Sequence, residues 1–370
     1  MREHGSRQSI PPRRCHWTCG PGRRRRSLEP GDVVCPCPMS LFAGRVWASH
    51  SAWYSVIPAL SLKGRVFLLR WDSIAGVVVG LLLASSGVQA QDSPILVLDD
   101  AGRVVELGRS PQRIVSLVPV ATEILFGLGE GKRLVGRSRY DDYPLEVSAV
   151  PDVGDAIRPS IETVLLRDPD LVIVIGGSDN AEAAREMARL GVPFVSLLFN
   201  TLDDLHMNVL RLGRLVGRSD EAFEMWERIE HELDEVRTAV DGSPRPRVFY
   251  DVGYPPAFTA GAGSYLDTLV TIAGGSNVFG DLSAPASRVS LEAIMGRDPD
   301  VIIHPVSDGA GAGGVVPSER PGWSHLRAVR SGSVRTVPAD LLHRLGPRIG
   351  EAARLLAIAL HPEAKNLLLP

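Results

Sequence analysis

The chain has 370 residues, of which 22% are charged, and a formal net charge of −3. Of its 40 Lys and Arg, 12 precede Gln91, as do 4 of its 43 Asp and Glu, so the 280 residues from Gln91 onward carry a net charge of −11. That acidic balance argues against nucleic acid as a partner, because nucleic-acid binding needs a basic surface. The length suffices for two ordinary domains.

Residues 1–70 are rich in Arg, Pro and Ser and show no sustained hydrophobic period. We interpret them as an unstructured extension, or as translation from a start codon chosen too far upstream. All four cysteines lie there, without a partner set at the spacing of a zinc site. They are Cys15, Cys19, Cys35 and Cys37. We therefore predict neither a disulfide nor a thiol nucleophile after Gln91.

Residues 71–90 have the features of a secretory signal: basic residues just upstream, an apolar run from Ile74 to Ser86, and small residues ending at Ala90. The alternative is a membrane anchor, but the uncharged run is shorter than the roughly 20 residues that span a bilayer. No cysteine follows it to accept a lipid. Cleavage after Ala90 would leave a soluble periplasmic protein beginning at Gln91.

Residues 91–216 predict an N-terminal lobe in which strands alternate with helices. A β-hairpin is expected at Ile95–Leu107, because the apolar residues alternate around a turn. The strands that follow are continuous apolar runs, which is typical of a parallel sheet covered by helices on both faces. These runs are Arg113–Leu117, RLVGRS, LVIVIG and Pro193–Phe199, separated by helical patterns at ATEILFGLG and NAEAAREMARLG.

Residues 217–242 predict one long helix, with Ser219 placed to cap its start and Gly242 its end. Its apolar residues recur mainly at intervals of three and four. They are Ala222, Phe223, Trp226, Ile229, Leu233, Val236 and Val240. A helix of about 20 residues spans about 30 Å, which is long enough to bridge two lobes.

Residues 243–370 repeat the strand–helix scheme and predict a C-terminal lobe. The elements are strands at Arg247–Gly253, VIIHPV and SVRTVP, and helices at SYLDTLVTIAGG and from about Pro347 to Leu360. The expected fold class is therefore α/β, with two lobes that each contain a mainly parallel sheet with flanking helices, bridged by one long α-helix.

One segment occurs twice: SIETVLLRDPDLVIVI from Ser160 and SLEAIMGRDPDVIIHP from Ser290, 130 residues apart. In each copy a serine is placed to cap a helix, a glutamate (Glu162 or Glu292) follows in the first turn, and Arg-Asp-Pro-Asp ends the helix before a buried strand. The glutamates have two interpretations. They complement the helix dipole, worth about 0.3–1 kcal/mol, or they form a symmetric acidic pair that faces a partner.

The motifs RIVSLVPVATEILFGLG, SRYDDYP, VGDAIRPSIETVLLRDPDLVIV and RVFYDVGYPPAFTAGAGSYLDTLVTIAGG resemble the iron and cobalamin class of periplasmic binding proteins of ABC importers. The cobalamin-binding members are the most similar, and the resemblance covers nearly all of Ile95 to Leu360. It implies two lobes joined by a long helix, a ligand in the cleft between them, and a monomer that docks on a permease dimer. It also implies that Glu162 and Glu292 pair with arginines of the transporter.

The resemblance implies a corrinoid as the transported ligand, with no cofactor, and four ligand-binding residues: Tyr140, Phe258, Asp340 and Arg344. If their stretch is helical, Asp340 and Arg344 share one helix face. The alternatives are a half-buried aromatic for Tyr140, a core position for Phe258 and a solvated ion pair for the other two.

Small residues, Ala156 and Ala286, stand where the cobalamin binder has cleft tryptophans, so another corrinoid, haem or a ferric siderophore stays open as the ligand. Either Tyr140 or His343 is a candidate axial ligand for iron or cobalt.

An enzyme is the competing class, with Ser264 or Ser178 as the nucleophile. Neither serine lies in a G-x-S-x-G elbow or has a histidine at a known spacing, and the glycine runs lack the residues of a phosphate loop. The six histidines after Gln91 show no metal-ligand spacing, so no metal-ion site is expected. A purely structural protein would leave the acidic pair unexplained. We therefore predict a binding protein and not an enzyme.

Overall fold

The computed structural model describes residues 94–177, 181–253, 255–307 and 315–368. All of them belong to one compact unit that begins at Ser86. The predictions for residues 1–90, including the four cysteines and the signal, lie outside the described residues, as do Ser178 and the glycine run at 309–314. Among the helices that the structure describes, none combines the length and the apolar character needed to cross a bilayer.

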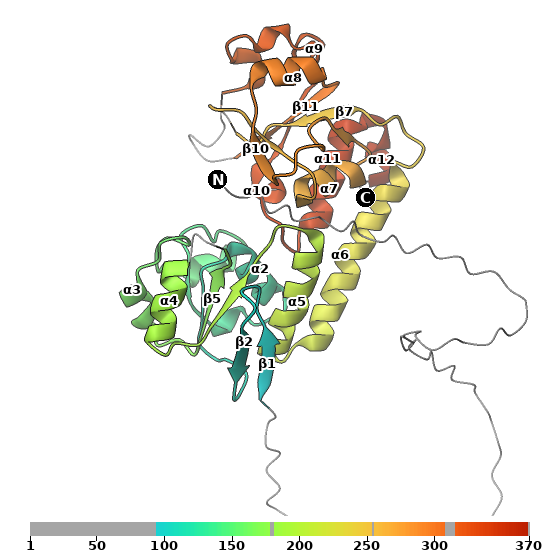
Figure 1. The fold of residues 1–370 in the computed structure, drawn as a ribbon. Coiled ribbons are helices and arrows are strands. Elements are labelled where there is room, and N and C mark those ends of the chain that lie inside the picture. Colours follow the sequence, from blue (N-terminus) through green and yellow to red (C-terminus); the bar gives the residue numbers. More distant parts are fainter. Residues whose placement is uncertain (1–93, 178–180, 254, 308–314, 369–370) are drawn as a thin grey trace, which may run out of the picture. The chain divides into compact units, whose positions relative to one another are not determined.

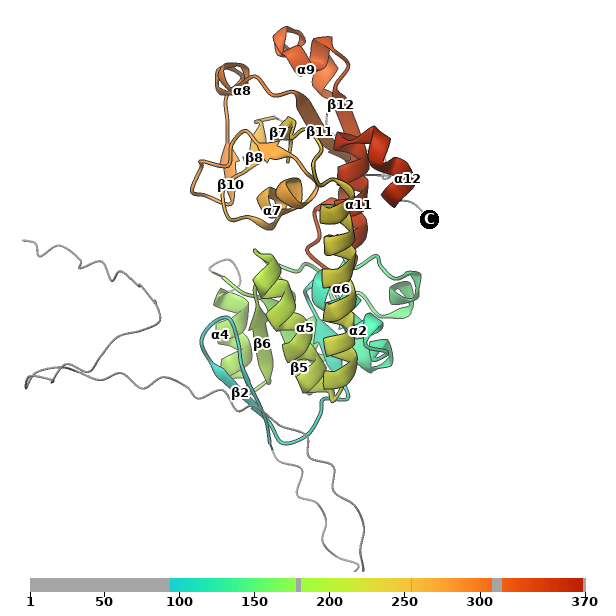
Figure 2. The same ribbon diagram turned by 90° about the vertical axis from the view of Figure 1, so that its right-hand side faces the viewer.

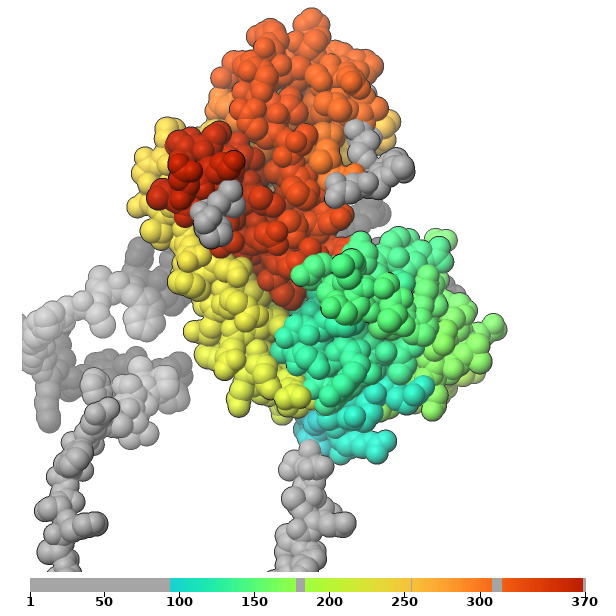
Figure 3. Space-filling model, turned by 180° about the vertical axis from the view of Figure 1, so that it is seen from behind, coloured from blue at the N-terminus to red at the C-terminus, as the bar shows by residue number. Residues whose placement is uncertain are grey.

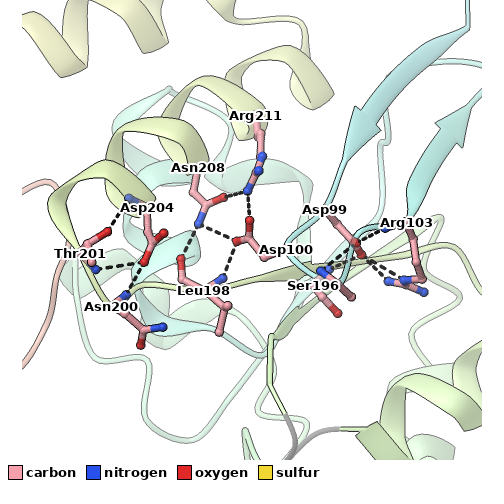
Figure 4. Close-up of polar contacts among 11 residues, drawn as sticks. Asp99, Asp100, Arg103, Ser196, Leu198, Asn200, Thr201, Asp204, Asn208 and Arg211 are labelled. Carbon is pink, nitrogen blue, oxygen red and sulfur yellow. Dashed lines mark hydrogen bonds and ion pairs between the residues drawn. The ribbon is translucent and has the colours of Figure 1, made fainter. Parts of the chain in front are cut away.

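The predicted hairpin is confirmed: β1 (Ile95–Leu98) pairs antiparallel with β2 (Val104–Leu107). Its turn is fastened to the first lobe by two neighbouring carboxylates (Figure 4). Asp99 accepts the backbone N–H of Ser196 at 3.2 Å, and Asp100 accepts that of Leu198 at 2.7 Å. Asp100 also pairs with the guanidinium of Arg211. The hairpin is therefore anchored by charge-assisted hydrogen bonds as well as by apolar packing.

The first large sheet has the strand order β4-β3-β5-β6, and all its pairings are parallel. Its strands are β3 (Ile114–Ser116), β4 (Leu134–Arg137), β5 (Leu171–Ile175) and β6 (Phe194–Leu197). The helices of this part are α2 (Pro119–Gly127), α3 (Ile161–Leu165), α4 (Ala181–Arg189) and α5 (Leu202–Val216), with 3₁₀ turns at Gly131–Arg133 and Leu145–Ala149. Residues 94–216 are called the N-terminal lobe below.

The predicted long helix is α6 (Ser219–Ala239), which has 21 residues. The expectation that Ser219 caps it is wrong: Arg218 occupies the cap position without a side-chain hydrogen bond, and Ser219 is the first helical residue. α6 packs against α5 and also against α11 (Ile349–Leu360), as Figures 1 and 2 show. One buried apolar cluster includes its inner face and residues of both large sheets. The helix is therefore part of a continuous core.

The second large sheet has the strand order β12-β11-β7-β9 and is also parallel throughout. Its strands are β7 (Arg247–Tyr250), β9 (Ser276–Asn277), β11 (Val301–Val306) and β12 (Val334–Pro338). A separate antiparallel ribbon pairs β8 (Phe258–Ala260) with β10 (Ala286–Arg288). Residues 243–368 are called the C-terminal lobe. Two parallel sheets with flanking helices confirm the predicted fold class.

Several short helices complete the C-terminal lobe. Besides α11 they are α7 (Tyr265–Ile272), α8 (Leu291–Arg297), α9 (Arg327–Arg330), α10 (Ala339–Leu342) and α12 (Lys365–Leu368), with 3₁₀ turns at Pro317–Glu319, Trp323–His325 and Pro362–Ala364.

The two copies of Arg-Asp-Pro-Asp follow α3 and α8 as predicted, but proline alone does not end these helices. Asp168 and Asp298, the residues before the prolines, adopt left-handed backbone angles with φ of 47° and 40°. Aspartate is among the few residues that tolerate this region, and the residue before proline is disfavoured in the right-handed helix. The Asp-Pro pair therefore turns the chain from helix into strand in both lobes.

Candidate ligand-binding site

The residues predicted to bind a ligand lie beyond the carboxyl ends of parallel strands. Tyr140 follows β4, Phe258 follows β7, and Asp340 and Arg344 follow β12. Open α/β sheets bind ligands outside this edge, because the strands hold loops there that are free to vary. Both lobes thus place predicted ligand residues at the edge where this architecture forms sites.

Tyr140 is half exposed, with a relative accessibility of 50%, and its hydroxyl donates to Oδ2 of Asp155 at 2.8 Å. This hydrogen bond to a carboxylate, together with the charge of Asp155, raises the pKa of Tyr140. The pKa of Asp155 is lowered by the backbone N–H groups of Arg158 and Ile157, and then by Tyr140. Tyr140 is therefore a neutral, oriented phenol whose ring is accessible to a ligand.

The buried side chain of Asp141 holds the loop that carries Tyr140, called the Tyr140 loop below. Its carboxylate accepts from the hydroxyls of Thr122 in α2 and Ser138, each at 2.5 Å. Burial raises the pKa of Asp141, and these two hydrogen bonds partly oppose the shift. Since buried polar groups are costly unless satisfied, this arrangement holds the loop in one conformation.

Arg344 connects the two lobes. The condition that would place it on one helix face with Asp340 is not met, because α10 ends at Leu342. Instead its guanidinium donates to both carboxylate oxygens of Asp142, to Oδ2 at 2.8 Å, and to the backbone carbonyl of Tyr140 at 3.0 Å. The structure therefore brings Arg344 and the Tyr140 loop together, while Asp340 stays exposed on the C-terminal lobe.

A second connection between the lobes is more deeply buried. Glu123 of α2 accepts from Arg348 twice, at 3.1 and 2.9 Å, and from Arg344 at 3.4 Å. The guanidinium of Arg348 also lies 3.7 Å from the centre of the Tyr143 ring. In Figure 3 the red C-terminal segment lies against the cyan and green N-terminal lobe, beside yellow α6.

Phe258 lies on the β8–β10 ribbon and is 37% exposed. Its backbone N–H donates to the carbonyl of Gly253 at 3.0 Å, which places the ribbon just past the end of β7. Of the two small residues singled out in the sequence, Ala286 is exposed on β10, whereas Ala156 is buried. Only Ala286 is therefore accessible at the surface.

A buried polar cluster in the C-terminal lobe was not anticipated. Asp251, at the carboxyl end of β7, contacts Nδ1 of His304 at 2.8 Å and accepts from Arg320 at 2.6 Å. Burial acts to raise the pKa of Asp251, but hydrogen bonds from His304 and Arg320 lower it overall. In the sequence, the only sign of this polar cluster is the aspartate that directly follows the apolar strand RVFY.

His343 lies next to this cluster, with its ring centre 6.2 Å from that of Tyr250. Desolvation of the imidazole by the surrounding protein lowers the pKa of His343, although the charges of Asp340 and Asp251 oppose the shift. The residue is partly accessible, so a neutral imidazole is presented after β12. Among the described residues, no cluster of three or more His, Cys, Asp or Glu is arranged to hold a metal ion.

Glu162 and Glu292 are each the second residue of a serine-capped helix and are exposed. Ser160 accepts from the N–H of Thr163 at 3.3 Å, and Ser290 from that of Ala293 at 3.2 Å, so both predicted caps are confirmed. The backbone N–H at the helix start and the Ser290 hydroxyl lower the pKa of Glu292. The two helices, α3 and α8, lie in different lobes (Figure 1).

Ser264, the described candidate for a nucleophile, has a structural role. It caps α7 by accepting the N–H of Asp267 at 3.2 Å, and its hydroxyl donates to the carbonyl of Gly261 at 2.8 Å. Both contacts use the hydroxyl locally, as helix caps do.

Two α/β lobes, each with a parallel sheet, are joined by one long helix and carry polar loops at the carboxyl edges of their sheets. Together with the family and relatives given next, this architecture identifies a substrate-binding protein of an ABC importer. The chain belongs to the periplasmic binding protein family Peripla_BP_2, whose model matches residues 114–341. The family is extracytoplasmic, and the relatives below are transport proteins and not enzymes.

Among curated proteins, the chain is 27% identical over 277 residues to the uncharacterized ABC transporter substrate-binding lipoprotein YvrC of Bacillus subtilis, which covers 73% of this chain and 86% of that protein. It is 29% identical over 246 residues to the vitamin B12-binding protein of Pectobacterium carotovorum, covering 66% and 86% respectively. Among solved structures, the apo form of the periplasmic heme-binding protein RhuT from Roseiflexus is 27% identical, with a TM-score of 0.61, covering 68% of this chain and 99% of that one.

Proposed function

We propose that the protein captures a corrinoid between its two lobes and delivers it to the permease dimer of an ABC importer. The observation that carries this proposal is the convergence of Arg344 on the Tyr140 loop, which joins predicted ligand residues from the carboxyl edges of both sheets. The exposed rings of Tyr140 and Phe258 provide flat apolar surface for a macrocycle. The similarity to a vitamin B12-binding protein supports the same ligand class.

Haem is the second candidate ligand. It is favoured by the similarity to a heme-binding protein, by the exposed Ala286, and by the imidazole of His343, which is neutral and accessible. The hydrogen bond from the Tyr140 hydroxyl to Asp155 disfavours deprotonation of the phenol, and a tyrosinate is the form that would bind iron. His343 is therefore the more suitable axial ligand. A ferric siderophore remains the third ligand class.

An absorption titration separates these ligands. The full chain, and the chain beginning at Gln91, are titrated with cyanocobalamin, cobinamide and haemin at equal concentrations, with calorimetry in parallel. Saturable one-to-one binding of a corrinoid supports the first proposal. Binding of haemin alone, with a shifted Soret band that His343→Ala abolishes, replaces it with haem uptake. Failure to bind any tetrapyrrole contradicts both.

We further propose that Glu162 and Glu292 dock the protein on the permease. Both are exposed, and each precedes an exposed apolar residue by three positions, Leu165 and Met295 respectively. An ionised side chain beside exposed apolar surface suits a transient interface, since complementary charge fixes the register and speeds encounter.

Reversal of both charges, Glu162→Arg with Glu292→Arg, is expected to abolish ligand uptake into permease-containing vesicles while leaving ligand affinity unchanged. The matched control is Glu227→Arg with Glu230→Arg on the exposed side of α6. Uptake that survives the first double change would rule out docking through these residues.

We also propose that residues 71–90 direct export and are removed after Ala90, which places a monomer in the periplasm. The mass of the exported protein and its elution volume test both parts. A chain that retains residues 71–90 contradicts the cleavage.

A further inference from the structure

The β8–β10 ribbon presents a second polar group beside Phe258. In its antiparallel register Arg288 lies directly opposite Phe258, and Ala286 lies opposite Ala260. Residues opposite each other in such a pair project from the same face, with Cβ atoms about 4.5–5.5 Å apart. Phe258 and Arg288 therefore stand side by side, as the adjacent strands in Figure 2 illustrate.

The two faces of this ribbon differ in accessibility. Thr259 and Ala260 of β8 are buried, whereas Phe258, Ala286 and Arg288 are exposed. Ala260 therefore packs on the protein, and the open part of this face consists of Phe258, Ala286 and Arg288. The open face combines an aromatic ring, a guanidinium and a small residue that leaves room beside them.

The ribbon is held firmly enough to act as a platform. Beyond its paired residues, Val289 donates to the carbonyl of Ala257 at 3.0 Å and Gly261 to that of Pro285 at 3.0 Å. Added to the Phe258–Gly253 hydrogen bond, these contacts fix both ends of the ribbon past the carboxyl end of β7. An Arg on such a support requires less ordering of the backbone on binding than one on a mobile loop.

The two arginines that join the lobes beside the other predicted ligand residues are already paired with carboxylates. Arg344 binds Asp142, and Arg348 binds Glu123. By contrast, no hydrogen bond or ion pair of the Arg288 guanidinium is found within the described residues. Arg288 thus offers an unneutralised cation beside the aromatic ring.

We propose that Arg288 is a ligand-contacting residue that selects, within the tetrapyrrole class, molecules with an anionic group at the edge of the macrocycle. This inference rests on the proposed function. The ring packs on Phe258, and the guanidinium binds the anion through two parallel N–H donors, as arginine does with carboxylates and phosphates. Ala286 leaves space for the bulk of the ring.

The anion has two chemical sources, a carboxylate on a porphyrin or the phosphate of a complete cobalamin. Two pairs of probes distinguish them: haemin against its dimethyl ester, and cyanocobalamin against cobinamide, which lacks the phosphate-linked nucleotide. Each pair changes the charge of the ligand edge while retaining the metal macrocycle. The full chain is titrated with both pairs as the wild type, as Arg288→Gln, and as the control Arg330→Gln.

Arg330 is the control because it is an exposed arginine of α9. Figures 1 and 2 show that α9 lies apart from β8 and β10. Arg288→Gln is expected to weaken binding of the anionic member of a pair roughly ten-fold. Binding of the member that lacks the anionic group should stay unchanged, and Arg330→Gln should change the binding of neither member.

Equal weakening of both members, or of neither, overturns the role of Arg288 and leaves the proposed function in place. A wild type that binds no probe overturns the proposed function and this inference together, so the two failures are distinguishable.

Discussion

The second aspartate of each Arg-Asp-Pro-Asp copy fastens the start of a neighbouring strand. Asp170 accepts the backbone N–H groups of Gln112 and Arg113, each at 2.8 Å, just before β3. Asp300 accepts that of Arg247 at 2.8 Å, at the start of β7. These N–H groups lie at the amino ends of central strands, where a carboxylate satisfies donors that would otherwise need water. The repeated tetrapeptide therefore has a structural role that is independent of the two glutamates.

This role predicts a pH-dependent loss of stability in Asp300→Asn. Burial acts to raise the pKa of Asp300, but the Arg247 N–H and the Arg327 guanidinium lower it below its ordinary value of 3.8. A lowered folded-state pKa gives stability that is present above the unfolded-state value and lost as the pH falls through the folded-state value. The variant should lose about 1–2 kcal/mol at neutral pH, and less in acid.

Urea unfolding of both proteins from neutral pH down to about pH 3 measures this difference. Asp298→Asn is the matched control, because Asn tolerates the left-handed conformation and the ion pair of Asp298 with Arg327 is at the surface. It should cost less than about 0.5 kcal/mol. A loss in Asp300→Asn that does not change with pH would contradict the ionic explanation.

At the scale of elements, the strands were the most predictable part. β5 is a continuous apolar run and β11 begins with one, and the shortness of these runs and their β-branched residues favour buried strands. α5 was not anticipated, although Thr201 and Asp204 form a capping box at its start. The start of α6 was misplaced because Gly217, with φ of 73°, and Arg218 join two helices in a tight turn that leaves Ser219 inside the helix.

The close approach of α5 and α6 predicts that Gly213→Ala destabilises the protein. A Cβ at this position would lie 2.3 Å from Cβ of Ala222 and 2.7 Å from the carbonyl oxygen of Arg218. Alanine gains about 1 kcal/mol of helix propensity over glycine, but overpacking of this kind costs about 1–3 kcal/mol, so a net loss is expected.

Gly296 in α8 provides the control, because a Cβ there meets nothing within 4 Å. Gly296→Ala should raise the melting temperature slightly, while Gly213→Ala lowers it. Equal shifts in thermal unfolding would show that the contact between α5 and α6 relaxes without cost.

At the scale of the whole molecule, the sequence predicted which strand ends carry the candidate site but not how the lobes meet. Arg344 and Asp142 are 202 residues apart, and no local pattern links them. The i, i+4 spacing of Asp340 and Arg344 suggested a pair, whereas the end of α10 at Leu342 separates them. Long-range ion pairs depend on how the lobes are placed around α6, which periodicity within one element does not determine.

The two connections between the lobes differ in burial, and this predicts different energies. The Glu123 side chain is 3% exposed, whereas that of Asp142 is 58% exposed. Removing one partner of a buried pair leaves an uncompensated charge and costs about 3–5 kcal/mol, while exposed pairs contribute about 0–1 kcal/mol. Because Arg344 and Arg348 retain some contact with water, Glu123→Gln should cost about 2–3 kcal/mol, and Asp142→Asn less than 1 kcal/mol.

Urea unfolding of the chain beginning at Gln91, in a Trp226→Phe background, tests this difference, since Trp323 is then its one tryptophan and reports on the C-terminal lobe, while circular dichroism reports on both lobes. In the parent protein the two signals should change together, because one apolar core runs through both sheets and α6. In Glu123→Gln the transitions should separate, as the lobes lose their buried polar connection. If Asp142→Asn is as costly as Glu123→Gln, burial does not set the energies of the two connections. If the transitions stay coincident in both variants, α6 and the apolar core alone couple the lobes.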